Sequence, residues 1–168
     1  MSRRAKAALA SGLGVVALTA TYLTVPWESV ENRAYWDSIG KVWTVCAGET
    51  KGVKPGDVYT DKQCSDMLMR RLEVDYRRPL QKCIRGFDGA PLSVQAAFLD
   101  LSYNVGVGAV CGSTAARRAM AKDWPGACEA MTWFNKAGGR VIRGLDLRRK
   151  DGDERRIGER ELCLEGLK

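Results

Sequence analysis

The six cysteines place the strongest constraint on how this chain of 168 residues can fold. Their number is even and they are widely spaced, without a Cys-x-x-Cys pair, which favours disulfides over a zinc ribbon. Because disulfides persist in oxidising compartments, we expect the folded domain to lie outside the cytoplasm. The spacing alone leaves every pairing open. The cysteines are Cys46, Cys64, Cys83, Cys111, Cys128 and Cys163.

Length and composition limit the chemistry further. A chain of this length with 45% apolar residues can bury one core, so we expect a single soluble domain apart from whatever its ends carry. The sequence contains no histidine. Histidine is the usual base of nucleophilic triads and the commonest metal ligand, so Ser-His-Asp, Cys-His and zinc-dependent hydrolases are excluded. We expect neither a metal nor a cofactor.

The chain begins with a basic cluster at residues 3–6, followed by 19 residues, 7–25, without a formal charge. This layout is typical of an export signal or a membrane span, oriented with the rest of the chain exported. A buried core helix is the alternative interpretation. Alanine, glycine and threonine dilute the apolar run, so its retention in a bilayer should be marginal. The pattern leaves two outcomes open: cleavage near Ala20, or an uncleaved anchor that leaves the membrane.

Periodicity and punctuation predict a small β region among several helices. Residues 41–59 carry β-branched and aromatic runs interrupted by glycine and proline, as in a hairpin or three-stranded sheet. Thr60 and Gln63 form a capping box for a helix that should end at Pro79. Further helices are predicted over 92–104 with a stop at Gly106, over 114–122 with Ser113 as the N-cap, over 125–136, and up to about residue 164. The pattern indicates an α+β domain with a cleft between its two parts.

Two carboxylates follow the apolar run. Eight residues separate Glu28 from Asp37, and Thr44 lies in the first predicted strand. Glycoside hydrolysis needs a protonated carboxyl for the leaving oxygen and a second group that directs water or stabilises positive charge. A Glu on a helix beside apolar neighbours and an Asp on a solvated loop suit these two roles. The spacing alone fits ordinary surface carboxylates equally well, and Thr44 fits an ordinary strand threonine.

This segment resembles the phage-type lysozymes, the family-24 glycoside hydrolases, whose pattern is Glu-x8-Asp-x5-Thr followed by WTVC-G-x-T in exported members. The chain has Glu28, Asp37, then Trp-Thr-Val-Cys at 43–46 and Gly-Glu-Thr at 48–50. The similarity spans residues 27–165. Its further matches lie at 103–106, 133, 137–139, 143–145, 155–156 and 159–163.

The resemblance implies a lysozyme-like α+β fold, with a small antiparallel sheet, several helices and an interdomain cleft, preceded by an N-terminal apolar helix. It implies an endolysin muramidase that hydrolyses the β-1,4 bond between N-acetylmuramic acid and N-acetylglucosamine in peptidoglycan and lyses the host cell. Glu28 would be the general acid, Asp37 the electrostatic or water-directing carboxylate, and Thr44 the hydroxyl that orients the attacking water, with an inverting course. The implied disulfides are Cys46–Cys64, Cys83–Cys111 and Cys128–Cys163.

Two features depart from the family pattern. Six residues instead of five separate Asp37 from Thr44, and an added residue such as Lys41 would widen the turn. An extra segment occupies residues 145–153. Glu31 is a rival acid, placed one helical turn from Glu28. We expect Tyr103 and Asn104 either to line the cleft or merely to end a helix. We expect the basic C-terminal residues to form a solvated face rather than a nucleic-acid site; they are Arg148, Arg149, Arg155, Arg156 and Arg160.

The resemblance extends to endolysins with a signal-anchor-release segment, so we expect residues 1–26 to be this segment and 27–168 the catalytic domain. The partners would be peptidoglycan and, before release, the host inner membrane, with no nucleic acid and a monomeric enzyme. The tethered form would be inactive and face the periplasm, where the released form would act. The alternatives are a non-enzymatic cationic exported module that binds cell wall or membrane, and a lytic transglycosylase, which forms an anhydro product without consuming water.

Overall fold

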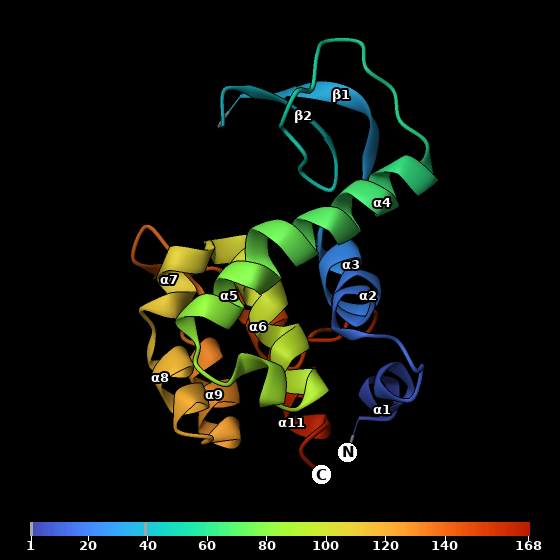
Figure 1. Cartoon of the computed structure of the whole chain (residues 1–168). Helices are drawn as coiled ribbons and strands as arrows, with labels where there is room; N and C mark the ends of the chain where they lie inside the picture. Colours follow the sequence, from blue (N-terminus) through green and yellow to red (C-terminus); the bar gives the residue numbers. More distant parts are fainter. Residues whose placement is uncertain (1, 39) are drawn as a thin grey trace.

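The computed structural model describes residues 2–38 and 40–168. A small β lobe stands on a larger helical body, and one long helical segment joins the two (Figure 1). The N-terminal helices lie along one side of the body, close to the C-terminus. The elements are α1 (Arg3–Leu9), α2 (Val15–Thr19), the π-helical η1 (Ala20–Thr24), α3 (Val25–Trp27), β1 (Glu31–Asp37), β2 (Val42–Cys46), α4 (Asp61–Arg71), the π-helical η2 (Leu72–Arg77), α5 (Arg78–Cys83), the 3-10 helix η3 (Phe87–Gly89), α6 (Leu92–Val105), α7 (Val107–Cys111), α8 (Thr114–Met120), α9 (Trp124–Met131), β3 (Lys136–Ala137), β4 (Arg140–Val141), α10 (Arg143–Arg149) and α11 (Glu159–Glu165).

The β lobe contains an antiparallel pair in which Tyr35 lies opposite Thr44 and Asp37 opposite Val42. Its first strand begins at Glu31, so the prediction of β structure only from residue 41 was wrong. Tyr35 and Trp36 favour a pleated surface, and the strand gains a partner only once the chain turns back as β2. The same pairing corrects the prediction that Asp37 lies on a loop, because it ends β1.

The connecting segment runs from α4 through η2 into α5. The Thr60 hydroxyl accepts from Gln63 N–H and the Gln63 side chain accepts from Thr60 N–H, which confirms the predicted capping box. The prediction that Pro79 ends this helix was wrong, because α5 continues to Cys83. In the π-helical turn, the N–H of Arg78 bonds the carbonyl of Glu73, five residues earlier, instead of the carbonyl four residues earlier. This shift in the hydrogen-bond pattern lets the helix continue through Pro79, which has no N–H to donate.

The helical body is built around α6, whose residues from Ser93 to Ser102 are buried on all sides. Gly106, at φ 87°, ends this helix as predicted, and the Ser113 hydroxyl caps α8 as predicted. The helix predicted over 125–136 is shorter, since α9 ends at Met131. Its last predicted residues enter the β3–β4 hairpin, which Gly138 and Gly139 turn at positive φ.

The N-terminal segment differs from the single apolar helix that we expected. It forms α1 and then the continuous run of α2, η1 and α3, separated by a turn at Gly12, where φ is 73°. Leu18 and Leu23 are fully buried together with Ala96 of α6 and Leu162 of α11. The interpretation as core helices therefore describes this structure. Across residues 2–38 and 40–168, no helix is both long and apolar enough to cross a bilayer.

The three disulfides confirm the pairing that the resemblance implied. Cys46–Cys64 fastens β2 to α4, and thus the β lobe to the connecting segment. Cys83–Cys111 joins α5 to α7, and Cys128–Cys163 joins α9 to the C-terminal helix. Each bond links elements that are distant in sequence, so the cysteines brace the lobe junction and two faces of the body.

Candidate active site

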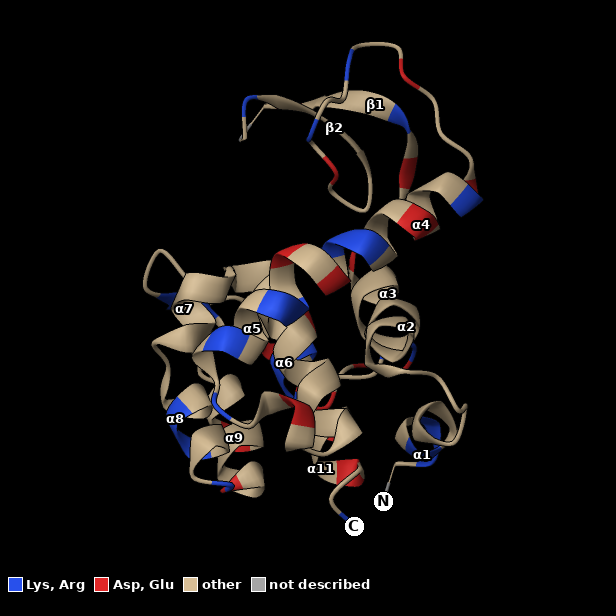
Figure 2. Ribbon diagram, viewed as in Figure 1, with Lys and Arg blue, Asp and Glu red and all other residues tan. Residues whose placement is uncertain are grey.

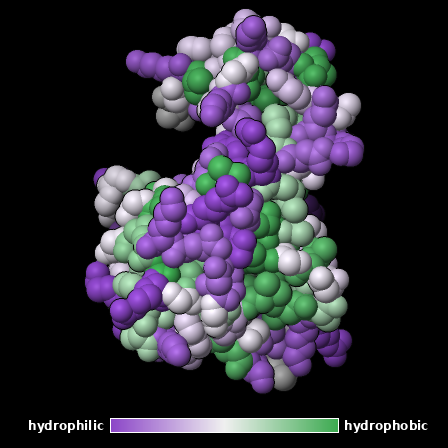
Figure 3. Space-filling view, in the orientation of Figure 1, coloured by the Kyte–Doolittle hydropathy of each residue, from purple (hydrophilic) through white to green (hydrophobic). Residues whose placement is uncertain are grey.

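The candidate site lies where the β lobe meets the helical body. A deep indentation separates these two parts on one side of the molecule (Figure 3). Glu28 follows α3 directly and precedes β1 by two residues, so it belongs to the junction itself. The expectation of a helix-borne acid needs a small correction, because Glu28 is the C-terminal cap of α3 with extended backbone angles.

The Glu28 side chain is held by an ion pair. Its Oε1 accepts from Nη1 of Arg148 at 2.6 Å, and the side chain remains 30% exposed. The preceding Trp27 is fixed on both sides, since its Nε1 donates to the carbonyl of Ile157 at 2.8 Å and the Arg156 guanidinium lies 3.8 Å from its ring centroid. The structure therefore presents one oriented carboxyl that substrate can reach.

Arg148 belongs to a buried charge cluster formed by Asp100, Arg148, Arg149 and Glu159. Asp100 accepts from Nε and Nη2 of Arg148 at 3.1 and 3.0 Å, and Arg149 bonds Glu159 and Asn104. Burial opposes the ionised form of Asp100, but the charge and hydrogen bonds of Arg148 outweigh it and lower its pKa. Burial raises the pKa of Glu159 well above its ordinary value. The two arginines thus pair with two fully buried carboxyl groups, of which Asp100 is held in its ionised form.

Arg148 and Arg149 correct the prediction of a solvated basic face. Their residues are 4% and 0% exposed, whereas Arg155 is exposed. Sequence reasoning missed both Arg148 and Asp100 as site residues. One signal was available: Asp100 is a lone carboxylate within the apolar run of α6, and a charge buried there requires a partner.

Asp37 and Thr44 lie on the β1–β2 hairpin above the body. The strand β1 begins three residues after Glu28 and ends at Asp37. Its seven residues rise about 3.3 Å each, so the strand spans roughly 20 Å. Its carboxylate lies against the turn, where a Cβ on Gly40 would come within 2.8 Å of Oδ2. Lys41 takes a left-handed φ of 52° in this turn.

Thr44 lies opposite Tyr35 and is 4% exposed, with its hydroxyl 3.4 Å from the carbonyl of Val42. The Glu28 carboxylate is bonded to Arg148, whereas the Thr44 hydroxyl faces the backbone of its own hairpin. The structure thus brings Glu28 to Arg148, and it places Asp37 and Thr44 together on the opposite lobe.

The other candidates take structural positions. Glu31 is the first residue of β1, opposite Cys46, so the expectation that it lies one helical turn from Glu28 was wrong. The Tyr103 hydroxyl donates to the carbonyl of Ala47 and links α6 to the β lobe. Burial raises the pKa of Tyr103, which keeps this donor protonated. Asn104 accepts from Arg149 in the buried charge cluster.

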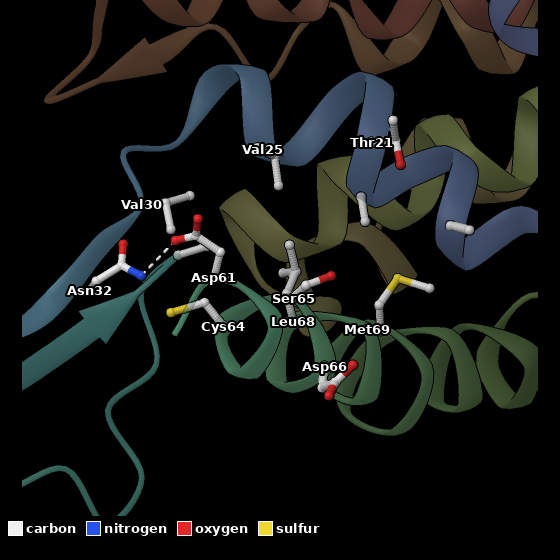
Figure 4. Close-up of a pocket in the computed structure, with 13 residues that line it drawn as sticks. Thr21, Val25, Val30, Asn32, Asp61, Cys64, Ser65, Asp66, Leu68 and Met69 are labelled. Atoms are coloured by element: carbon white, nitrogen blue, oxygen red, sulfur yellow. Dashed lines mark hydrogen bonds between the residues drawn. The ribbon is translucent and has the colours of Figure 1, made fainter. Parts of the chain in front are cut away.

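An apolar groove of about 740 Å³ lies between η1 and α4 (Figure 4). Asn32 and Asp61 close one end through a hydrogen bond of 2.7 Å. The groove contains none of Glu28, Asp37 and Thr44. It is lined by Ala17, Ala20, Thr21, Val25, Val30, Asn32, Ala47, Asp61, Cys64, Ser65, Asp66, Leu68 and Met69.

Comparison with known proteins identifies the family. The phage lysozyme family model matches residues 25–152. The SAR-endolysin of Enterobacteria phage P21 is 34% identical over 171 residues, covering 98% of this chain and 97% of that protein. The SAR-endolysin of Pseudomonas phage phiKMV is 36% identical over 163 residues, covering 95% of this chain and 89% of that protein. The crystal structure of the active form of P1 phage endolysin Lyz, at 24% identity, shares the fold with a TM-score of 0.73 over 97% of this chain and 92% of that one. This chain belongs to the phage lysozyme family.

Proposed function

We propose that the protein is a phage endolysin, a muramidase that hydrolyses the β-1,4 bond between N-acetylmuramic acid and N-acetylglucosamine in host peptidoglycan. The observation that carries this proposal is the position of Glu28. This carboxyl is at the junction of the two lobes, partly exposed and oriented by Arg148. A glycan strand is a long polymer, and an open indentation between two lobes suits it better than an enclosed pocket does.

The proposed chemistry divides its work between the two lobes. Glu28, from the junction, gives its proton to the leaving glycosidic oxygen as the bond to the anomeric carbon breaks. The Thr44 hydroxyl orients a water on the opposite face of the sugar, and the Asp37 carboxylate stabilises positive charge on the ring or directs this water. The water oxygen bonds the anomeric carbon as the leaving group departs, and one water proton passes to the Asp37 carboxylate, so that the configuration at this carbon is inverted.

The proposal includes control by residues 1–26 as a signal-anchor-release segment. While this segment lies in the inner membrane, it cannot pack against α6 and α11, so the contacts that hold Trp27 and Glu28 are incomplete. After release, the segment packs as it does here and the monomeric enzyme acts in the periplasm. The released N-terminus has a docking site on α11, where Arg4 of α1 donates to both Glu161 oxygens at 2.8 and 2.7 Å. Figure 2 shows basic residues on α1 and acidic residues on α11, near the two chain termini.

The test is the mass of the products that full-length protein releases from purified peptidoglycan. We expect hydrated disaccharide peptides, and we expect Glu28→Gln to abolish them. Glu31→Gln is the matched control because this exposed strand residue changes charge equally and should retain activity. Anhydro products would instead indicate a lytic transglycosylase. Binding to peptidoglycan without any product would indicate the non-enzymatic module.

A second experiment addresses the tether. Membrane fractionation before and after collapse of the membrane potential should move the intact chain from the inner membrane to the periplasm. A chain shortened at its N-terminus would contradict the release of an uncleaved segment.

A further inference from the structure

Thr24, the last residue of η1, joins the N-terminal segment to the buried charge cluster. Its hydroxyl donates to Oδ1 of Asp100 at 2.8 Å, and both residues are fully buried. The backbone carbonyl of the same Thr24 accepts from the N–H of Glu28 at 3.0 Å. One residue of the segment therefore contacts the proposed acid directly and contacts the cluster that orients it.

These contacts close into a ring. Thr24 bonds Asp100, Asp100 accepts from two nitrogens of Arg148, and Arg148 donates to Glu28. Glu28 returns to Thr24 through its N–H. The ring joins three separate pieces of the fold: the N-terminal segment, α6 and α10. Its members have little freedom, because three of the four side chains are at most 5% exposed.

The Thr24 hydroxyl matters because Asp100 and Glu28 share one donor, the guanidinium of Arg148. Arg148 must serve Asp100 and Glu28 at once, and its Nε is also 3.9 Å from Glu159. The Thr24 hydroxyl bonds the same Asp100 oxygen, Oδ1, that accepts from Nη2 of Arg148. It therefore helps to set the orientation of the Arg148 guanidinium, whose Nη1 donates to Glu28. A buried carboxylate that loses a donor pulls its remaining donor toward itself, at the expense of any partner they share.

We propose that Thr24 is a positioning residue, whose hydroxyl couples the docking of the N-terminal segment to the orientation of the Glu28 carboxyl. This inference rests on the proposed function, in which Glu28 is the acid and the segment leaves the membrane. Threonine suits both states of the segment. In a membrane helix its hydroxyl can bond the carbonyl four residues earlier, whereas in the docked form it reaches Asp100. The acid is thus fully oriented only when the segment is docked.

The chain supplies a matched control in Thr19, on the same continuous helical run. Thr19 is also fully buried against α6, but its hydroxyl bonds the backbone carbonyls of Val15 and Ala96 at 2.8 and 3.3 Å and touches no charged group. Thr19→Val and Thr24→Val remove the same hydroxyl from the same helical run and keep the same shape. They differ only in whether the lost bond leads to the buried charge cluster.

The experiment measures kcat and KM for hydrolysis of purified glycan strands by the full-length protein, together with Tm. For Thr24→Val we expect kcat to fall about tenfold with KM unchanged within about twofold, because a buried hydrogen bond to a charged group is lost. Thr24→Ser should restore kcat. Thr19→Val should lower Tm comparably and leave kcat within about twofold.

Equal kcat loss in both valine variants, or no rescue by serine, would overturn the inference. If Thr24→Val does not fold, Thr24→Ala removes the hydroxyl without requiring space for a branched apolar side chain and is compared with Thr19→Ala. Glu28→Gln is measured beside these variants. An active Glu28→Gln protein would refute the proposed acid, whereas an inactive one with fully active Thr24→Val would refute only the positioning role.

Discussion

Replacement of Arg148 by methionine tests whether the buried charge cluster stabilises the junction. Methionine keeps much of the apolar stem but removes both bonds to Asp100 and the ion pair with Glu28. Asp100 is fully buried, so its charge would lose its main partner. Breaking a buried pair by removing one member costs about 3–5 kcal/mol, which is a large share of a domain's stability. For a chain of this size, this loss lowers Tm by roughly 10 °C.

The assay is urea unfolding at pH 7 with the disulfides intact. Arg155→Met is the matched control, because it removes the same charge from an exposed side chain of the neighbouring loop and should change stability by less than about 0.5 kcal/mol. The double variant Arg148→Met with Asp100→Leu should recover part of the loss, since it leaves no uncompensated carboxylate. Equal effects of Arg148→Met and Arg155→Met would refute the reasoning.

The pH dependence gives an independent check on the same cluster. Arg148 lowers the pKa of Asp100 in the folded protein, so the stability from this ionised group is present above the unfolded value of about 4. It is lost as the pH falls through the folded pKa. In Arg148→Met, Asp100 takes up a proton more readily, because burial raises its pKa and the main partner that opposes this effect is lost. The stability difference between the two proteins should therefore shrink as the pH falls from 7 toward 4.

Three further predictions follow from individual contacts. Glu161→Gln removes the charge that Arg4 meets, so hydrogen exchange in residues 2–9 should accelerate while exchange in α6 does not change. Tyr103→Phe removes the hydroxyl that donates to Ala47, and should lower the free energy of unfolding by about 1 kcal/mol; an unchanged value would mean that the lobes are held together without it. Replacing Cys46 and Cys64 together by serine opens a loop with a sequence separation of 18, and should cost about 3 kcal/mol in urea unfolding.

The features that sequence predicted well depend on neighbours along the chain. The Thr60 capping box, the Ser113 cap and the stop at Gly106 each follow from a few adjacent residues and from backbone hydrogen bonds that close locally. The disulfide pairs came from the resemblance, not from local pattern, since spacing fixes no pairing.

The features that sequence missed depend on contacts across the fold. β1 exists because β2 returns beside it, and the helix passes Pro79 because a π-helical turn rearranges its ladder. The burial of Arg148 needs Asp100 from α6 and Glu28 from the junction, three residues that lie far apart in the sequence. The local sequence around Arg148 predicts a solvated basic face. Burial of this arginine becomes favourable only because carboxylates distant in the sequence pair with it.

The composition of the N-terminal segment is compatible both with the predicted signal anchor and with the packed helices of this structure. Glycine, alanine and threonine make residues 7–25 poor at remaining in lipid, yet they suit close packing on α6 and α11. Gly12 allows the turn between α1 and α2, Ala5 and Ala8 are fully buried, and the hydroxyls of Thr19 and Thr24 donate to buried acceptors. In the proposed release from the membrane, the small and polar residues that would weaken the anchor are also those through which the docked segment reaches the proposed catalytic acid.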